Sequence, residues 1–172
     1  ERYGRLPIYP LVSDRAVPAS VLRAVLPIMI KAGQDFGAAD SYGQTPLMSA
    51  VYYRSLAAWD ELLAAGANPS TASPEGRTAW HALAVSTYQK DFDAIVDRIL
   101  KARVDINARD REGLTALAVA CDLGVDLEFI KLLVAKGADP AIADIDGLTA
   151  MGAAKIRGNK TITTYLGGLK VP

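Results

Sequence analysis

Histidine and cysteine, two side chains often used for nucleophilic chemistry and metal binding, occur once each in this 172-residue sequence, as His81 and Cys121. A catalytic thiol needs a nearby base such as histidine to take its proton. In the repeating pattern described below, the two residues fall one unit apart and near opposite ends of their helices. A zinc site needs three or four protein ligands, which the sequence does not gather around His81. We therefore expect structural roles for both residues, with no catalytic cysteine and no bound metal.

Other signatures of catalysis are also missing from the sequence. It has no glycine-rich phosphate-binding loop, no paired-carboxylate signature, and no serine, histidine and aspartate set that spacing would bring together. The single cysteine excludes an internal disulfide bond. A small-molecule site would need a deep polar pocket, which only the segment from Tyr88 to Phe92 could edge. The sequence thus predicts a protein that is not an enzyme and carries no cofactor.

The charge balance is neutral, with 19 basic and 19 acidic residues, and 51% of the residues are hydrophobic. No long basic run is present, so the electrostatic footprint of a nucleic-acid-binding protein is missing. No stretch of about 18 uninterrupted apolar residues is present, so no segment is predicted to insert into a membrane. These features indicate one folded domain whose partners are neither nucleic acids nor lipid bilayers.

Glycine recurs at two fixed places in a repeating unit. The first set is Gly43, Gly76, Gly113 and Gly147, and the intervals between its members are similar but not identical. The second set is Gly33, Gly66, Arg103 and Gly137, with the same intervals and with Arg103 in place of a glycine. The separation between each member of the second set and the next member of the first is therefore constant. A segment of fixed length is typical of a hairpin, because a slip of one residue would turn its side chains to the other face.

Threonine stands two positions after each glycine of the first set, and these residues are Thr45, Thr78, Thr115 and Thr149. A threonine hydroxyl at a helix N-cap accepts a hydrogen bond from an unpaired amide of the first turn. We therefore predict that a helix begins after each threonine, with Pro46 at the first helical position of one of them. A second helix in each unit carries bulky apolar residues on one face, such as Phe129 and Leu133. Trp59 and Trp80 are predicted to be buried by this pattern.

The most complete unit, from Asp110 to Asp139, resembles the ankyrin repeat. It reads D-R-E-G-L-T-A-L-A-V-A-C, a short break and L-E-F-I-K-L-L-V-A-K-G-A-D, and the family signature is T-P-L-H-x-A at a period of about 33 residues. The segment Thr78-Ala79-Trp80-His81 matches the same signature, although alanine replaces the proline in every unit except the one with Pro46. The resemblance implies an all-α repeat solenoid, an elongated stack of helix pairs joined by β-hairpin-like loops. It also implies that His81 bonds to the backbone and to threonine beside a hairpin.

The resemblance divides a single domain, residues 1–172, into five parts. These are an N-terminal cap or degenerate repeat at 1–39, repeats at 40–72, 73–109 and 110–143, and a C-terminal cap repeat at 144–172. Helices are expected near Pro10-Leu11 and from Ser20 to Lys31. The repeat at 73–109 holds an insertion, which counting from the flanking glycines places near Gln89–Phe92. Extra length in one repeat maps to a loop, and both simple loop drift and a functional protrusion would explain it.

The resemblance further implies that the chain binds another protein through its hairpin tips and the exposed ends of its first helices. The residues of this sequence expected to make such contacts are Tyr42, Gln44, Tyr52, Tyr53, Arg77, Tyr88, Phe92, Arg111, Glu112, Leu114 and Asp122. Tyrosine provides a large contact area at low side-chain entropy and is enriched in binding hot spots. We expect at least two of Tyr42, Tyr52 and Tyr53 to be exposed. The alternative, that one of them packs against the neighbouring repeat, stays open.

The organisation as caps plus repeats favours a stand-alone binding module that inhibits or shields a partner enzyme and is monomeric when free. Short bacterial ankyrin proteins of similar organisation include immunity proteins that protect the producing cell from its own toxic enzymes, cell-wall hydrolases among them. The alternative is a scaffold or adaptor that recruits a partner as part of a longer chain. Because the sequence begins at Glu1 rather than methionine, we expect that a tag or a targeting segment was removed. A removed signal would suit a periplasmic protein, which we favour slightly over a cytoplasmic one.

Overall fold

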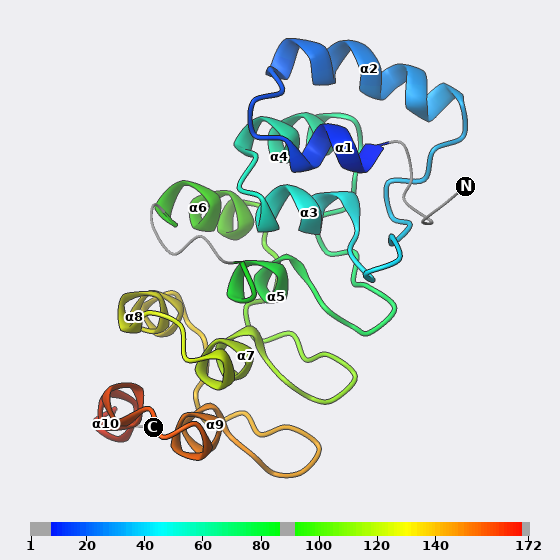
Figure 1. Ribbon diagram of the computed structural model, residues 1–172. Helices are drawn as coiled ribbons and strands as arrows, with labels where there is room; N and C mark the ends of the chain where they lie inside the picture. The colour runs from blue at the N-terminus through cyan, green and yellow to red at the C-terminus, as the bar shows by residue number, and fades with distance from the viewer. Residues whose placement is uncertain (1–7, 87–91, 170–172) are drawn as a thin grey trace. The chain divides into compact units, whose positions relative to one another are not determined.

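The computed structural model describes residues 8–86 and 92–169, and these residues form ten α-helices and no β-strand (Figure 1). The one β-type pairing between described residues is an isolated antiparallel bridge from Ala143 to Thr149. The predicted all-α class is therefore confirmed. The chain divides into two compact units, Glu1–Val104 and Asp105–Pro172, so the boundary falls inside the predicted repeat at 73–109.

The N-terminal unit is built from pairs of helices. Its helices are α1 (Ile8–Ser13), α2 (Ala19–Lys31), α3 (Pro46–Tyr52), α4 (Leu56–Ala64), α5 (Ala79–Ala84) and α6 (Asp93–Lys101). The first helices of the pairs form one layer, in which α1 packs on α3 and α3 packs on α5 (Figure 1). In a second layer, α2 packs on α4. The helices expected near Pro10-Leu11 and at Ser20–Lys31 are thus present, as α1 and α2.

Ion pairs join second helices of neighbouring pairs in this unit. Arg98 in α6 donates from Nε and Nη2 to the two carboxylate oxygens of Asp60 in α4, both at 2.8 Å. Arg23 in α2 makes the same kind of two-pronged contact with Glu61 in α4. The planar guanidinium matches the carboxylate fork, so these pairs fix the orientation of neighbouring helices, although their exposed charges add little to stability.

The C-terminal unit contains two further helix pairs. Its helices are α7 (Ala116–Leu123), α8 (Leu127–Ala135), α9 (Ala150–Ile156) and α10 (Lys160–Gly167). The first helix α7 packs on α9, and each packs on its own partner, α8 or α10. The predicted threonine caps are confirmed here, because the hydroxyl of Thr115 accepts from the backbone N–H of Ala118 and that of Thr149 accepts from Gly152.

The segment of constant length is a hairpin held by one side chain. In each hairpin, one side-chain oxygen of this residue accepts hydrogen bonds from the backbone N–H groups of the residues two and four positions later. The backbone N–H of the same residue donates to the carbonyl of the residue four positions later. The four residues are Asp40, Ser73, Asp110 and Asp144. Adding one residue inside the turn would break these bonds, so the turn itself has a fixed length.

Arg103 adopts the backbone conformation of the glycines whose place it takes. Its φ is 56°, a left-handed value, against 101° for Gly137 at the equivalent position. The next N–H, from Val104, donates back to the carbonyl of Ile99 and closes the helix end. Arg103 therefore does take the place of a glycine, as the intervals between the glycines indicated. Because arginine has a Cβ, this left-handed conformation costs about 1–2 kcal/mol of backbone strain.

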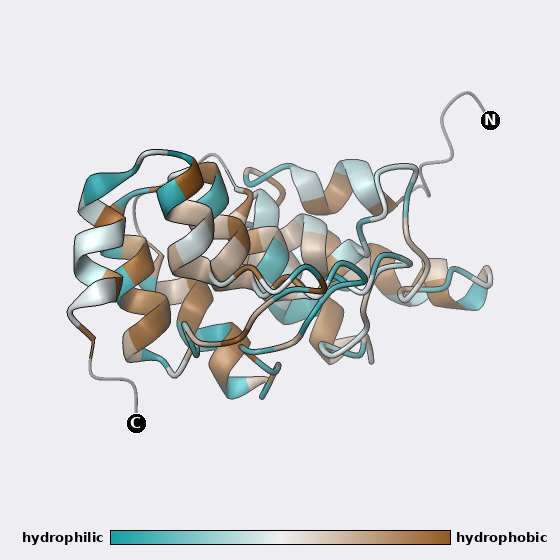
Figure 2. Ribbon diagram, turned by 90° about the horizontal axis from the view of Figure 1, so that it is seen from below, coloured by the Kyte–Doolittle hydropathy of each residue, from teal (hydrophilic) through white to brown (hydrophobic). Residues whose placement is uncertain are grey.

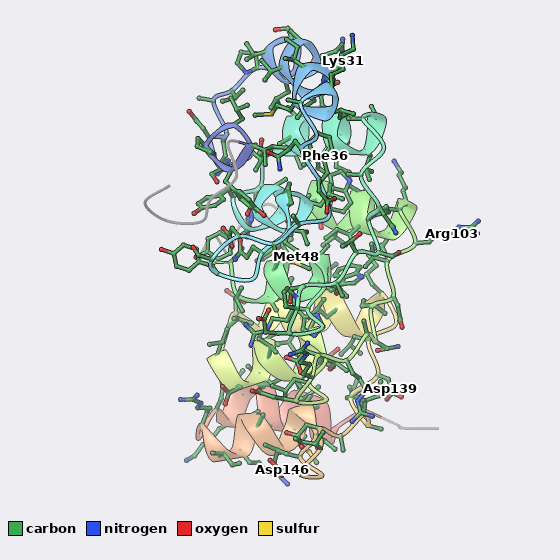
Figure 3. The ribbon with its side chains drawn as sticks, turned by 90° about the vertical axis from the view of Figure 1, so that its right-hand side faces the viewer. Lys31, Phe36, Met48, Arg103, Asp139 and Asp146 are labelled. Atoms are coloured by element: carbon green, nitrogen blue, oxygen red, sulfur yellow. The ribbon has the colours of Figure 1, made fainter. Side chains whose placement is uncertain are left out.

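Both tryptophans are buried, as predicted, with Trp59 1% and Trp80 0% exposed. The indole N–H of Trp80 donates to the carbonyl of Val104 at 3.0 Å, so its one polar atom is satisfied. Most helices show both apolar and polar residues in Figure 2, as expected for helices with one face toward a core. Figure 3 shows Arg103 projecting outward, whereas Phe36 is buried within the N-terminal unit.

Candidate protein-binding site

The hairpin at residues 40–44 positions two of the predicted contact residues. The carboxylate oxygen Oδ1 of Asp40 accepts the backbone N–H of Tyr42 at 2.8 Å and that of Gln44 at 3.1 Å. The N–H of Gly43 donates to the carbonyl of Asp40 at 2.9 Å. Tyr42 therefore stands at the tip of a closed turn, and its side chain is 72% exposed.

Helix α3 brings Tyr52 and Tyr53 to the opposite end of the same surface. Its N-cap is Thr45, whose hydroxyl accepts the N–H of Met48, and Pro46 occupies the first position. The helix ends after two turns, because Arg54 takes a left-handed φ of 53°. The rings of Tyr52 and Tyr53 contact each other edge to face, with centroids 5.0 Å apart and an interplanar angle of 76°.

Hydrogen bonds tie the hairpin to both neighbouring helices. The hydroxyl of Ser49 in α3 donates to Oε1 of Gln44 at 3.1 Å. The buried Tyr9 of α1 donates from its hydroxyl to the carbonyl of Ala38 at 3.0 Å and also contacts the carbonyl of Gln44. The side chain of Gln44 is thus held in place before any partner arrives.

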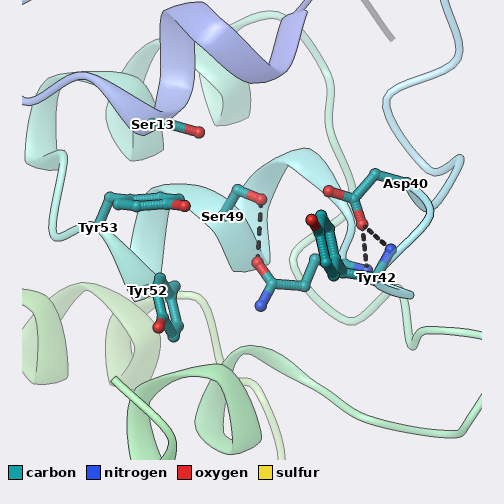
Figure 4. Close-up of a pocket in the computed structure, with 7 residues that line it drawn as sticks. Ser13, Asp40, Tyr42, Ser49, Tyr52 and Tyr53 are labelled. Atoms are coloured by element: carbon teal, nitrogen blue, oxygen red, sulfur yellow. Dashed lines mark hydrogen bonds between the residues drawn. The ribbon is translucent and has the colours of Figure 1, made fainter. Parts of the chain in front are cut away.

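These elements enclose a polar cavity of about 290 Å³ (Figure 4). Its lining residues are Ser13, Asp40, Tyr42, Gln44, Ser49, Tyr52 and Tyr53. Four of them are contact residues predicted from the sequence. The predicted set omits Ser13, at the end of α1, because the segment 1–39 lacks the repeat pattern that would place it. Among these lining residues Asp40 has the single carboxylate, and none is cationic.

A second, smaller hollow of about 40 Å³ adjoins the same hairpin tip. It shares Tyr42 and Gln44 with the larger cavity and adds Glu75, the exposed Arg77 and the buried His81. The structure therefore brings five of the predicted residues onto one surface of the N-terminal unit. We call this surface, made of Tyr42, Gln44, Tyr52, Tyr53 and Arg77, the tyrosine face.

The exposure expected for the tyrosines is only partly right. Tyr42 is exposed, but Tyr52 and Tyr53 are both half-buried, so the expectation that at least two would be exposed is wrong. The reason is the tight turn after α3, which folds Arg54 inward and leaves the two rings against each other at the helix end. Each of the two rings keeps one part in the cavity.

The insertion predicted near Gln89–Phe92 contributes little that the structure describes. Tyr88 and residues 87–91 lie outside the described residues. Phe92 is half-buried, and its ring lies under the guanidinium of Arg54, whose Cζ is 4.4 Å from the ring centroid. Arg54 also donates to the hydroxyl of Ser86. Phe92 therefore packs against Arg54 while part of its surface stays exposed, and its role as a contact residue stays a prediction.

The remaining predicted contacts belong to the C-terminal unit. Arg111 and Glu112 are exposed at a hairpin tip, and Leu114 is half-buried beside them. Asp122, at the end of α7, accepts two hydrogen bonds from Arg157 at 2.9 Å, and these bonds hold the pKa of its carboxyl below the usual range. The carboxylate thus joins neighbouring repeats. The large exposed apolar side chains of this unit that the predicted set omits are Leu123, Ile145 and Ile156.

The chemistry of His81 and Cys121 agrees with structural roles. Nδ1 of His81 accepts the backbone N–H of Thr78 at 3.1 Å and lies 3.1 Å from its hydroxyl, as the family resemblance implied. The thiol of Cys121 is 0% exposed, and burial raises its pKa to about 12, so it stays protonated and unreactive near neutral pH. Within residues 8–86 and 92–169, no group of three or more metal-ligating side chains comes together.

No helix in the described part of the chain has the length and apolar character needed to cross a membrane. The hairpins, capped helix pairs and recurrent left-handed turns reproduce one structural unit several times. Comparison with known families agrees: the family described as ankyrin repeats (3 copies) matches residues 58–144 and 82–168, and the single ankyrin repeat matches residues 42–73. This chain belongs to the ankyrin-repeat family. Ankyrin repeats indicate a protein-binding module, so the tyrosine face is a candidate protein interface.

Relatives of this ankyrin chain include much longer proteins. The ankyrin repeat and KH domain-containing protein mask-1 of Caenorhabditis elegans is 34% identical over 72% of this chain and 5% of its own length. Protein lin-12 of the same organism is 36% identical over 77% of this chain and 9% of its own length. The human B-cell lymphoma 3 protein is 29% identical over 83% of this chain and 31% of its own length. The chain therefore spans less than a third of each of these relatives.

Proposed function

We propose that this ankyrin chain is an adaptor that recruits a partner protein through the tyrosine face. The observation that carries the proposal is the cavity itself. Four contact residues predicted from family positions, Tyr42, Gln44, Tyr52 and Tyr53, line one hollow with polar walls. A cavity with aromatic and polar walls suits an anchor side chain of a partner, and such anchors dominate binding energy.

The tyrosine face is preorganised for binding. Asp40 fixes the tip that carries Tyr42, and the bond from Ser49 fixes the side chain of Gln44. Groups that are already ordered lose less entropy when a partner binds, so more of the contact energy remains as affinity. The layer of α1, α3 and α5 continues this surface across three helix pairs. A stable interface of about 800 Å² per partner has room on such a surface.

The lengths of the relatives agree with recruitment by one part of a longer chain. In mask-1, lin-12 and B-cell lymphoma 3 protein, the matching part is a small share of a longer protein. We infer that an ankyrin part of a longer chain would bring its bound partner to the other parts of that chain. The inhibitor and self-protection role expected from the sequence gains no support from these animal proteins, and the monomeric state of the free chain stays a prediction.

Affinity capture from an extract of the source organism tests the proposal. The wild-type chain and Tyr42→Ala serve as baits, with Lys101→Ala, an exposed change on α6, as the matched control. We expect at least one protein that the wild type and Lys101→Ala retain and that Tyr42→Ala loses. Retention of every captured protein by Tyr42→Ala would overturn the tyrosine face as the interface.

The activity of a captured partner separates recruitment from inhibition. If the partner is an enzyme, its rate is measured with and without a saturating amount of this chain. An unchanged rate supports recruitment. A rate that falls in proportion to the amount of enzyme bound by this chain would overturn the adaptor role and support the inhibitor role in its place.

A further inference from the structure

We propose that Tyr9, in the first helix α1, is a positioning residue of the tyrosine face and fixes the hairpin that carries Tyr42. This inference rests on the proposed function, because it names a residue that keeps the tyrosine face in the conformation that binds. The sequence places Tyr9 in the N-terminal cap at 1–39, outside the predicted contact set. The structure connects it directly to the hairpin at 38–44.

The first observation is a pair of contacts made by one hydroxyl. The hydroxyl of Tyr9 donates to the carbonyl of Ala38 at 3.0 Å and also contacts the carbonyl of Gln44. These two carbonyls stand on either side of the hairpin tip, where Tyr42 is exposed. A hydroxyl carries a single proton, but a bond to either carbonyl ties the hairpin to α1. One side chain therefore holds both arms of the hairpin against the same helix.

The second observation is that α1 is firmly anchored. Three of its side chains, Ile8, Tyr9 and Val12, are each at most 1% exposed, and α1 packs on α3. Close packing restricts the positions that buried side chains can take. The ring of Tyr9 is thus fixed in the core of the N-terminal unit, and its hydroxyl reaches the hairpin from that fixed point.

The third observation is that the other backbone bonds of the hairpin act within it. The carbonyl of Gln44 also accepts the N–H of Asp40 at 2.9 Å. Oδ1 of Asp40 accepts the N–H groups of Tyr42 and Gln44. These bonds give the turn its shape, whereas the contacts of Tyr9 connect the backbone of the turn to α1. Shape and placement of the hairpin therefore depend on different side chains.

The same helix also forms part of the larger cavity. Ser13, the last residue of α1, is among the lining residues drawn in Figure 4. Tyr42 and Gln44, on the hairpin that Tyr9 holds, are lining residues as well. Helix α1 thus contributes one lining residue itself and positions two others, and its role extends beyond covering the repeat that follows it.

Loss of the Tyr9 hydroxyl should weaken binding through the hairpin. Tyr9→Phe keeps the buried ring, but the carbonyls that the hydroxyl contacted must then meet water or shift. The tip should sample more positions in the free chain. Because a partner would have to order the tip on binding, less of the contact energy would remain as affinity. The folded repeats themselves should persist.

Amide hydrogen exchange of the full chain, followed by NMR, tests the positioning role without a partner. The N–H groups of Gly43 and Gln44 are bonded to Asp40, so their exchange reports opening of the hairpin. We expect Tyr9→Phe to speed their exchange by about threefold or more. In the hairpin of the C-terminal unit, the amide of Leu114, at the position equivalent to Gln44, should exchange as in the wild type. Unchanged exchange at Gly43 and Gln44 would overturn the proposal.

Two controls separate positioning from a general loss of stability. Tyr165→Phe makes the same substitution at a half-buried tyrosine of α10 in the C-terminal unit, and it should leave exchange in the hairpin at 38–44 unchanged. The amides of Trp59 and Leu62, buried in α4, report the stability of the N-terminal unit. In Tyr9→Phe their exchange should change less than that of the hairpin. Equal acceleration in α4 and in the hairpin, or acceleration of the hairpin by Tyr165→Phe, would overturn the proposal.

The captured partner distinguishes failure of this inference from failure of the proposed function. We expect Tyr9→Phe to weaken its binding by about threefold or more, with a less favourable binding entropy in calorimetry, and Tyr165→Phe to bind it as the wild type does. If Tyr42→Ala loses the partner while Tyr9→Phe binds it as the wild type does, the interface stands and the positioning role is wrong. If Tyr9→Phe loosens the hairpin but neither Tyr9→Phe nor Tyr42→Ala alters binding, the tyrosine face itself is wrong.

Discussion

The carboxylate of Asp40 accepts the backbone N–H of Tyr42 at 2.8 Å, and this single bond places the most exposed tyrosine of the described chain at a hairpin tip. The same oxygen also accepts the N–H of Gln44. A structural requirement of the repeat and a requirement of recognition therefore meet in one side chain. Asp40 closes the turn, and the turn carries Tyr42 to the rim of the cavity.

Replacing Asp40 should show how much its side-chain oxygen stabilises the turn. Asp40→Ala removes the acceptor of two backbone N–H groups and should lower the free energy of unfolding by about 1–2 kcal/mol. Asp40→Asn keeps an acceptor oxygen and should cost less than about 0.5 kcal/mol. Urea unfolding followed by circular dichroism measures both. Equal losses for the two variants would contradict the turn-closing role of the side-chain oxygen.

Gly113 should tolerate alanine much less well than Gly147, although both have a φ of 80°. A Cβ at Gly113 would lie 2.6 Å from Nη2 of Arg109 and 2.9 Å from the backbone nitrogen of Ile145, whereas no described atom beyond its chain neighbours lies within 4 Å of a Cβ at Gly147. Gly147→Ala should cost about 1–2 kcal/mol from the left-handed backbone alone. Gly113→Ala should cost at least about 1 kcal/mol more, because the next hairpin must move.

The measurement is again the free energy of unfolding, with Gly147→Ala as the control for backbone strain. Arg109 donates to the carbonyls of Gly113 and Ala143, so it bridges the two hairpins of this unit. Equal costs for the two alanine variants would show that the hairpins do not approach as closely as the structure places them.

Arg103→Gly should stabilise the protein. The left-handed φ of 56° strains a residue that has a Cβ, and the side chain is exposed. Glycine is more flexible in the unfolded chain, so ordering it costs extra entropy. The free energy gained by relieving the strain should exceed that cost, and a gain in stability of up to about 1 kcal/mol is expected. Thermal or urea unfolding would detect it, and a loss of stability would contradict the predicted strain.

Arg54→Gly is the matched variant with the opposite expectation. Arg54 has a similar φ of 53°, but its side chain is 6% exposed and its guanidinium contacts the ring of Phe92 and the hydroxyl of Ser86. Loss of these buried contacts should outweigh the relief of strain, and the free energy of unfolding should fall by at least about 1 kcal/mol. Stabilisation by this change would show that Arg54 contributes nothing through its side chain.

The thiol of Cys121 should react only after unfolding. Its pKa is raised to about 12 by burial, whereas a thiol in an unfolded chain ionises near pH 8.5. At pH 8, a thiol reagent such as iodoacetamide should label the protein rapidly in urea and very slowly in its absence. Fast labelling of the folded chain would contradict the burial of this helix face.

The repeat pattern made much of the fold predictable. The intervals between glycines located the hairpins and placed Arg103 at a position otherwise held by glycine, and the structure shows a left-handed φ there. The threonines marked the starts of first helices, because the cap uses a local hydrogen bond. These features depend on residues close in sequence, which is why a single sequence reveals them.

Features that depend on neighbouring elements were less predictable. Ser13 reaches the cavity because α1 packs on α3, and nothing in the irregular N-terminal segment indicates that packing. Phe92 lies under Arg54, and Asp122 pairs with Arg157, because side chains far apart in the sequence meet when helices stack. Their rotamers and partners follow from the folded geometry, not from the repeat pattern.

The most direct test of the tyrosine face is cross-saturation NMR of the chain bound to its captured partner. Saturation of the partner's protons reduces the intensity of amides at the interface. We predict the largest losses at the amides of Tyr42, Gly43 and Gln44 and at those of Tyr52 and Tyr53. Losses centred instead on the second helices α4 and α6 would contradict the central claim that the partner binds at the tyrosine face.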